Sequence, residues 1–141
     1  MDCLPAGMEL FPAVDLKQFE FIKRVIDDCD YYVLIVGGRY GTLTSEGISF
    51  TEAEYEYAIS KGLKLLAFIH SEPNQLSVER SEQDPHLIEL LENFRQKVSM
   101  GRLVEFWTKS EDLPALVVLS MFQTIKIYPA IGWIRGDKAN R

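Results

Sequence analysis

The sequence predicts a three-layer α/β domain, in which helices cover both faces of a mainly parallel sheet of about four strands. Two observations indicate this class. Strand-like and helix-like segments alternate along the chain with short connections, and strands separated by helices pair in parallel through right-handed crossovers. The strand-like segments are also continuously apolar, as in strands that are covered on both faces. We expect residues 1–141 to form a single domain.

The first half of the chain predicts strand, helix and strand in turn. Residues 8–11 form a short apolar run. Asp15 then stands at the start of a helical pattern, with a glutamine three residues later as in a capping box. Residues 31–36 read YYVLIV and predict a buried strand, which Gly37 and Gly38 end.

The middle of the chain predicts a second helix and another buried strand. The helix is expected over residues 51–61 and should stop at Gly62, because glycine readily adopts the left-handed conformation that closes helices. Residues 63–69 are apolar apart from one lysine and predict the strand that follows.

The last third predicts helix, strand and helix. Asp84 followed by proline marks the start of the clearest helix, whose apolar face is formed by Leu87, Leu91, Phe94 and Val98. Residues 103–107 predict a strand, and Ser110 is expected to cap the last helix. The apolar residues of the tail, 131–134, are expected to pack on the domain.

Composition excludes several classes of partner. The formal net charge of −6, without a basic cluster, disfavours nucleic acid. No apolar run is long enough to span a bilayer, so we expect no membrane association and a cytoplasmic location. Cys3 and Cys29 have no metal-binding spacing and the chain has only two histidines, so neither a metal nor a cofactor is expected.

The turn after the YYVLIV strand is a candidate ligand-binding loop. Parallel sheets bind ligands at the carboxyl ends of their strands. The loop residues are Gly37, Gly38, Arg39, Tyr40, Gly41 and Thr42. Glycine lets the backbone approach a ligand, and a guanidinium can bind phosphate or carboxylate. The loop lacks the lysine of a P-loop and is not GxGxxG, so it is either a ligand loop or a simple turn.

Two glutamates follow this loop at the start of the next helix. Ser49 with Glu52 and Thr51 with Glu54 both match a capping box, so each glutamate has a structural role available. Glu54 also shares a helix face with Ala58, whose small side chain lets the helix lie close to the sheet. A carboxylate there can attack or stabilise an oxocarbenium-like sugar carbon, as in glycosyl transfer.

Two other reactive groups are weaker candidates. His70 lies at the carboxyl end of a predicted strand, where a lone histidine is more often a hydrogen-bonded loop residue. Cys29 lies between two aspartates at the end of a helix, and this surrounding should raise the pKa of its thiol.

Four phrases of the sequence together resemble a known family: PAGMELFPA, IDDCDYYVLIVGGRYGTL, EGISFTEAEYEYA and PAIGWIR. This is the domain of unknown function numbered four-zero-six-two, which is similar to TIR domains and to nucleoside 2-deoxyribosyltransferases. The resemblance implies a flavodoxin-like sheet. Some of those relatives cleave an N-glycosidic bond with a helix-borne glutamate that precedes a small residue by four positions, as Glu54 precedes Ala58.

The resemblance also implies that the family's first strand and helix are missing, because members usually carry them before the phrase PAGMELFPA. We expect a nucleotide or NAD-like ligand, held by residues 37–42 with Ser49 and Thr51, and N-glycosidic cleavage, as a hydrolase or transferase, with Glu54 as the catalytic residue. The alternative is a non-catalytic module for homotypic assembly in a signalling or defence protein. Under either interpretation we expect a homo-oligomer.

Overall fold

The structure, a computed structural model, describes residues 3, 5–6, 16–101 and 103–132. Its elements alternate as the sequence predicts: α1 (Leu16–Asp27), β1 (Tyr31–Val36), α2 (Phe50–Ser60), β2 (Lys64–His70), α3 (Pro85–Ser99), β3 (Val104–Trp107) and α4 (Leu113–Ile127). Three short 3₁₀ helices join them: η2 (Pro73–Gln75), η3 (Val78–Arg80) and η4 (Ser110–Asp112). The expected strand at residues 8–11 and the tail residues 133–141 lie outside the described residues. The expectation that the tail packs on the domain is wrong for Ile131, which is 89% exposed.

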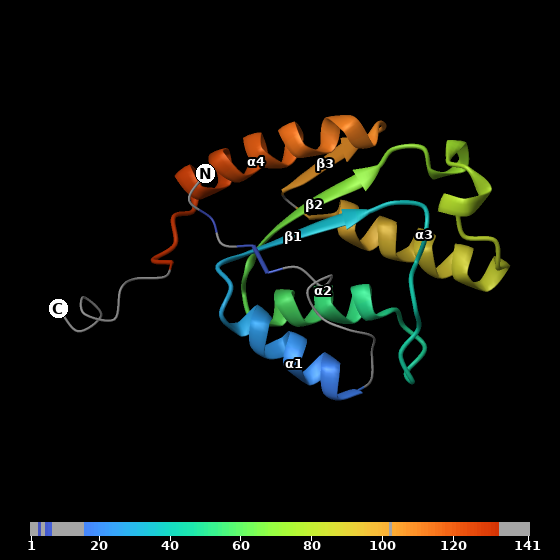
Figure 1. The fold of residues 1–141 in the computed structure, drawn as a ribbon, viewed down its shortest axis with the longest axis horizontal. Helices are drawn as coiled ribbons and strands as arrows, with labels where there is room; N and C mark the ends of the chain where they lie inside the picture. Colours follow the sequence, from blue (N-terminus) through green and yellow to red (C-terminus); the bar gives the residue numbers. More distant parts are fainter. Residues whose placement is uncertain (1–2, 4, 7–15, 102, 133–141) are drawn as a thin grey trace.

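The described strands form a parallel sheet in the order β1-β2-β3 (Figure 1). Tyr31 lies opposite Lys64 in the first pair, and Ala67 lies opposite Val104 in the second. All strands therefore end at the same edge of the sheet. The α/β class is confirmed, with a layered arrangement consistent with a flavodoxin-like sandwich.

Helices cover the two faces of the sheet unequally. On one face, Leu34, Ala67 and Ile69 pack in a single core cluster against α2 and α3, whose contributing residues are Tyr55, Leu91, Phe94 and Val98. On the other face, Leu66 and Phe68 pack against Met121 of α4. Helix α1 joins the first face through Ile22 and Ile26, which contact Ala58 of α2. In the described part of the chain, only α4 covers the second face (Figure 1).

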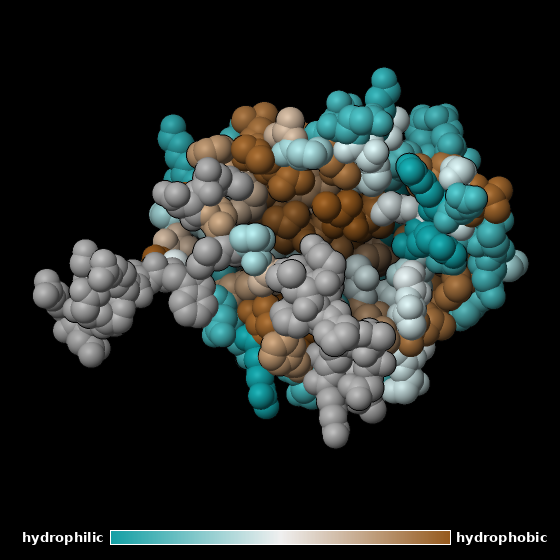
Figure 2. Space-filling view, in the orientation of Figure 1, coloured by the Kyte–Doolittle hydropathy of each residue, from teal (hydrophilic) through white to brown (hydrophobic). Residues whose placement is uncertain are grey.

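Strand β1 is consequently open on its α4 face. Val33 and Ile35 are 38% and 50% exposed, although the residues opposite them in β2, Leu66 and Phe68, are 2% and 0% exposed. The expectation that the YYVLIV strand is covered on both faces is therefore wrong for the described residues, because α4 lies over β2 and β3. Figure 2 shows hydrophobic side chains gathered over this part of the molecule.

The ends of the helices follow local sequence chemistry with one exception. The Asp84 carboxylate accepts hydrogen bonds from the amides of His86 and Leu87, so it caps α3 as expected. Gly62 has a φ of 73°, the left-handed conformation predicted after α2. The cap predicted at Ser110 is wrong, because Ser110 begins η4 and Asp112 precedes α4 without a side-chain cap.

The helices of the described residues are short relative to a membrane. None of them is long and apolar enough to cross a bilayer. The longest, α3 and α4, have 15 residues each.

Candidate functional site

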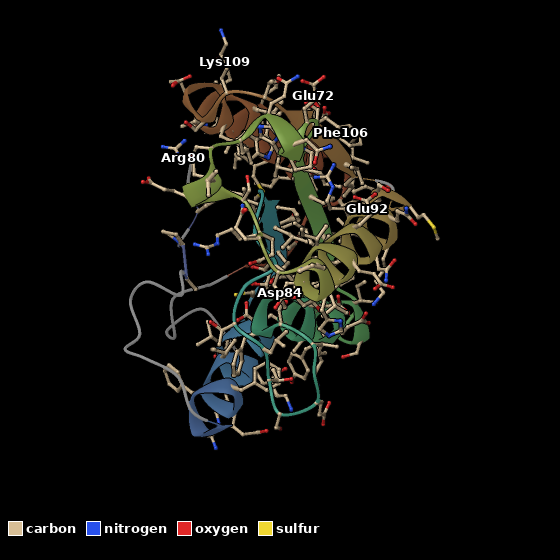
Figure 3. All side chains as sticks on the ribbon, turned by 90° about the vertical axis from the view of Figure 1, so that its right-hand side faces the viewer. Glu72, Arg80, Asp84, Glu92, Phe106 and Lys109 are labelled. Carbon is tan, nitrogen blue, oxygen red and sulfur yellow. The ribbon has the colours of Figure 1, made fainter. Side chains whose placement is uncertain are left out.

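A pocket of about 380 Å³ lies at the carboxyl ends of β1 and β3. Its walls come from three segments that are far apart in the sequence: the glycine turn after β1, the loop around η3 and the segment after β3. The lining residues are Gly37, Gly38, Arg39, Leu76, Glu79, Arg80, Trp107, Thr108 and Ser110. Figure 3 looks onto this edge of the sheet, with Arg80 on one side of it and Lys109 above. The pocket is large enough for a small ligand.

The glycine turn is joined to the η3 loop through its backbone. Gly38 pairs with Ser81 in a parallel β-bridge, and its carbonyl accepts a 2.8 Å hydrogen bond from the amide of Glu82. The Glu82 carboxylate in turn accepts a 2.7 Å bond from the amide of Tyr40. A β-carbon at Gly38 would lie 2.4 Å from the carbonyl oxygen of Arg80, so the two segments meet only because residue 38 has no side chain.

The positive charges of both pocket arginines are not neutralised by ion pairs with described residues. Among the described residues, neither Arg39 nor Arg80 forms an ion pair. The one side-chain bond of Arg39 runs from Nη1 to the carbonyl of Glu79 at 3.5 Å. The Glu79 carboxylate also lines the pocket, so the charged lining residues are two cations and one anion. This composition favours an anionic ligand.

The wall formed by β3 is held in place by a buried histidine. His70 is 2% exposed; its Nε2 lies 3.1 Å from the carbonyl of Thr108, and its Nδ1 accepts a 3.1 Å bond from the amide of Glu72. Because Nδ1 accepts, the ring proton is on Nε2, which donates to Thr108. The ring also packs edge-on against Trp107, whose Nε1 donates to the carbonyl of Phe68. His70 is hydrogen-bonded as the sequence interpretation expects, but it is the last residue of β2 and pairs with Trp107 rather than lying in a loop.

Helix α2 begins beside the glycine turn, and Ser49 is its cap. The Ser49 hydroxyl is fully buried and accepts a 3.0 Å bond from the amide of Glu52. Thr51 therefore lies inside the first turn, and the cap of the helix is Ser49 rather than Thr51. The Glu52 carboxylate bonds to Tyr40 and Lys97, so only the Ser49 half of the predicted capping box is seen. Gly41 faces both residues and has a φ of 98°, which favours glycine.

Tyr40 and Glu52 belong to a polar contact between α2 and α3. The Tyr40 hydroxyl donates a 3.0 Å bond to Glu52, which also pairs with Lys97 at 3.4 Å. Lys97 makes a second ion pair with Glu56. The ring of Tyr40 is 2% exposed and packs against Phe94. These contacts connect the two helices and the loop, and none of these side chains lines the pocket.

Glu54 lies apart from the pocket, against β1. It is 8% exposed, and its Oε2 accepts a 3.4 Å hydrogen bond from the hydroxyl of Tyr32. Burial raises the pKa of Glu54 to about 7, while the bond from Tyr32 acts in the opposite direction. Burial, together with the charge of Glu54, also raises the pKa of Tyr32. A carboxyl with such a pKa exchanges a proton near neutral pH, as catalytic carboxyls often do.

The thiol of Cys29 is a poor nucleophile. It donates a 3.2 Å hydrogen bond to the carbonyl of Val25 at the end of α1. Burial raises the pKa of the thiol, and the neighbouring charges of Asp30 and Asp28 raise it further. The direction expected from the sequence is confirmed, with burial as the largest cause.

The structure divides the predicted ligand residues into two groups. Gly37, Gly38 and Arg39 line the pocket, whereas the other five do not: Tyr40, Gly41, Thr42, Ser49 and Thr51. Sequence reasoning missed Arg80, which lies in a polar loop without periodicity or motif. It also missed the hydroxyls of Thr108 and Ser110, although both follow a predicted strand and so could have been placed at this edge.

Comparison with known proteins gives one match. No curated protein and no solved structure matches the chain. A family model, described as a domain of unknown function (DUF4062), matches residues 1–121. The family predicted from the four sequence phrases is therefore confirmed: this chain belongs to the DUF4062 family.

Proposed function

We propose that this chain binds a nucleotide or NAD-like ligand in the pocket at the carboxyl ends of β1 and β3. The observation that carries the proposal is the lining of that pocket: two glycines and two arginines without ion-pair partners among the described residues. Backbone amides and guanidiniums bind phosphate oxygens, and the carboxyl edge of a parallel sheet is where such ligands bind.

N-glycosidic cleavage by Glu54 is the catalytic extension of this proposal. In its support, the pKa of Glu54 is raised to about 7, and Tyr32 donates a hydrogen bond to its carboxylate. Cleavage requires the ribosyl carbon of the ligand to reach a carboxylate that is 8% exposed and lies outside the pocket lining. Ligand binding therefore has stronger support than catalysis.

One experiment tests both parts. The purified chain is incubated with NAD and with deoxynucleosides, and the release of nicotinamide or free base is followed beside binding of the intact ligands by calorimetry. Release that is lost in Glu54→Gln supports catalysis at this carboxyl. Binding without release supports a ligand-binding domain, and absence of both in the folded protein contradicts the proposal.

The open apolar face of β1 favours a second candidate function, homotypic assembly. Val33 and Ile35 are exposed on the face that α4 covers elsewhere, and α4 itself exposes Val118, Leu119 and Phe122, which are 42%, 57% and 55% exposed. None of these side chains carries a charge, so two copies of a chain with a net charge of −6 can meet there with little repulsion. In this second function, the open face of β1 binds a second copy of the same chain.

A further inference from the structure

We propose that Arg39 and Arg80 together bind the diphosphate group of a nucleotide, with Arg80 as a ligand-binding residue that no sequence motif indicates. This inference rests on the proposed function, since it names the phosphate-binding end of the same pocket. It assigns two apolar side chains of the pocket, those of Trp107 and Leu76, to the apolar part of the ligand.

The backbone brings the two arginines together from separate segments. Arg39 follows the pairing residue Gly38, and Arg80 immediately precedes Ser81, the partner of Gly38 in the β-bridge. The Arg39 guanidinium also reaches across to the carbonyl of Glu79. Because these contacts set the positions of both backbones, Arg39 and Arg80 line one pocket although they come from separate segments of the chain.

The charged residues that line the pocket suit an anion. They are two arginines and one glutamate, Glu79, so positive charge is in excess. The carboxylate of Glu82 does not line the pocket and accepts a hydrogen bond from the amide of Tyr40. Each guanidinium presents a planar fork of N–H donors that matches one phosphoryl group. Two forks from two segments therefore match two phosphoryl groups. This local excess of positive charge stands out in a chain whose net charge is −6.

Gly37 leaves room for the phosphates next to the backbone. No atom lies within 4 Å of the position that a β-carbon would take at Gly37, so this side of the turn is open. Thr108 and Ser110 also line the pocket, and hydroxyl groups of this kind can bond a sugar. The Trp107 ring beside them is held by its bond to the carbonyl of Phe68 and offers a fixed apolar surface.

Calorimetric titration with ADP, AMP and adenosine at low salt tests this inference. We expect ADP to bind more tightly than AMP, and AMP more tightly than adenosine. Arg39→Gln and Arg80→Gln should each weaken ADP binding about tenfold, which corresponds to about 1.4 kcal/mol, and leave adenosine binding unchanged. Lys109→Gln is the matched control, because Lys109 is a cation at the same edge that points away from the pocket (Figure 3).

The outcomes separate this inference from the proposed function. Equal affinities for all probes, or an Arg80→Gln variant that binds ADP like the wild type, would overturn the diphosphate site while leaving nucleotide binding intact. If no nucleoside or nucleotide binds, the proposed function fails. Titration with inorganic pyrophosphate then decides whether the two arginines still form a diphosphate-binding site. Pyrophosphate binding that both arginine variants weaken supports the site, and absence of binding overturns it.

Discussion

The backbone of Gly38 lies against the carbonyl group of Arg80: a β-carbon on residue 38 would stand 2.4 Å from the carbonyl oxygen and 2.7 Å from Cδ1 of Leu76. This contact closes the wall between the glycine turn and the η3 loop. The pocket therefore depends on the absence of one methyl group.

Gly38→Ala should destabilise the domain and open this wall. The φ of Gly38 is not positive, so the cost is steric, and overpacking of this kind costs about 1–3 kcal/mol. Urea unfolding measures the loss. Gly37→Ala is the control, because its β-carbon would meet no atom within 4 Å. Equal stability of the two variants would contradict the close contact.

Glu54 should make stability depend on pH. Its ordinary pKa is 4.5 and its folded pKa is about 7, because burial disfavours the charged form. Below pH 4.5 the carboxyl is protonated in both states, so its stabilising contribution is fully present. As pH rises, the unfolded chain ionises first, and the contribution is lost as pH passes about 7.

Urea unfolding of Glu54→Gln over the same pH range checks this expectation. The glutamine stays neutral and can still accept the bond from Tyr32, so the variant should lack the fall in stability between these two pKa values. Glu89→Gln, a change at an exposed glutamate of α3, should retain it. Parallel profiles for the wild type and Glu54→Gln would show that the carboxyl is not buried as described.

Ser49→Ala should cost about 1 kcal/mol of stability, because it removes the cap of α2 and leaves the amide of Glu52 without its acceptor. Thr51→Ala is the matched comparison at the other predicted capping box. Since Thr51 is not the cap, its replacement should change the unfolding free energy by less than about half as much. If Thr51→Ala lowered the unfolding free energy more than Ser49→Ala, the assignment of Ser49 as the cap of α2 would be wrong.

If the chain self-associates through the open face of β1, charged substitutions on that face should change its oligomeric state. The double variant Val33→Asp with Ile35→Asp should be monomeric at concentrations where the wild type associates, because a stable interface buries more than about 1,000 Å² and excludes unpaired charge. Sedimentation velocity measures this. Val78→Asp is the control, since Val78 is 72% exposed in η3, away from the open face of β1. A wild type that is monomeric at all concentrations contradicts the assembly function.

The fold could be predicted because its strands and helices carry strong local patterns. The apolar run of β1, the spacing of Leu91, Phe94 and Val98 in α3, and the glycine after α2 each specify an element without tertiary information. The open face of β1 could not be predicted in the same way. Its residues are as apolar as those of a covered strand, and only the position of α4 decides which of them are exposed.

The candidate site was predictable only in part. Glycines after a buried strand indicate the carboxyl edge of the sheet, and Gly37, Gly38 and Arg39 do line the pocket at that edge. Arg80 reaches the same pocket through the pairing of Gly38 with Ser81, a contact between distant segments that leaves no periodicity in the sequence. Glu54 shows the converse, because its helix position was predictable whereas the direction of its carboxylate, toward Tyr32, was not.

The strand order has a consequence for how the domain folds during synthesis. Among the described strands, each one pairs with the next along the chain, and β2 lies between the other two. The most buried residues of the sheet, such as Phe68, belong to this central strand. The ribosome must therefore release the chain beyond Trp107 before β2 has a partner on both edges. Until then one edge of β2 keeps its backbone N–H and C=O groups unpaired.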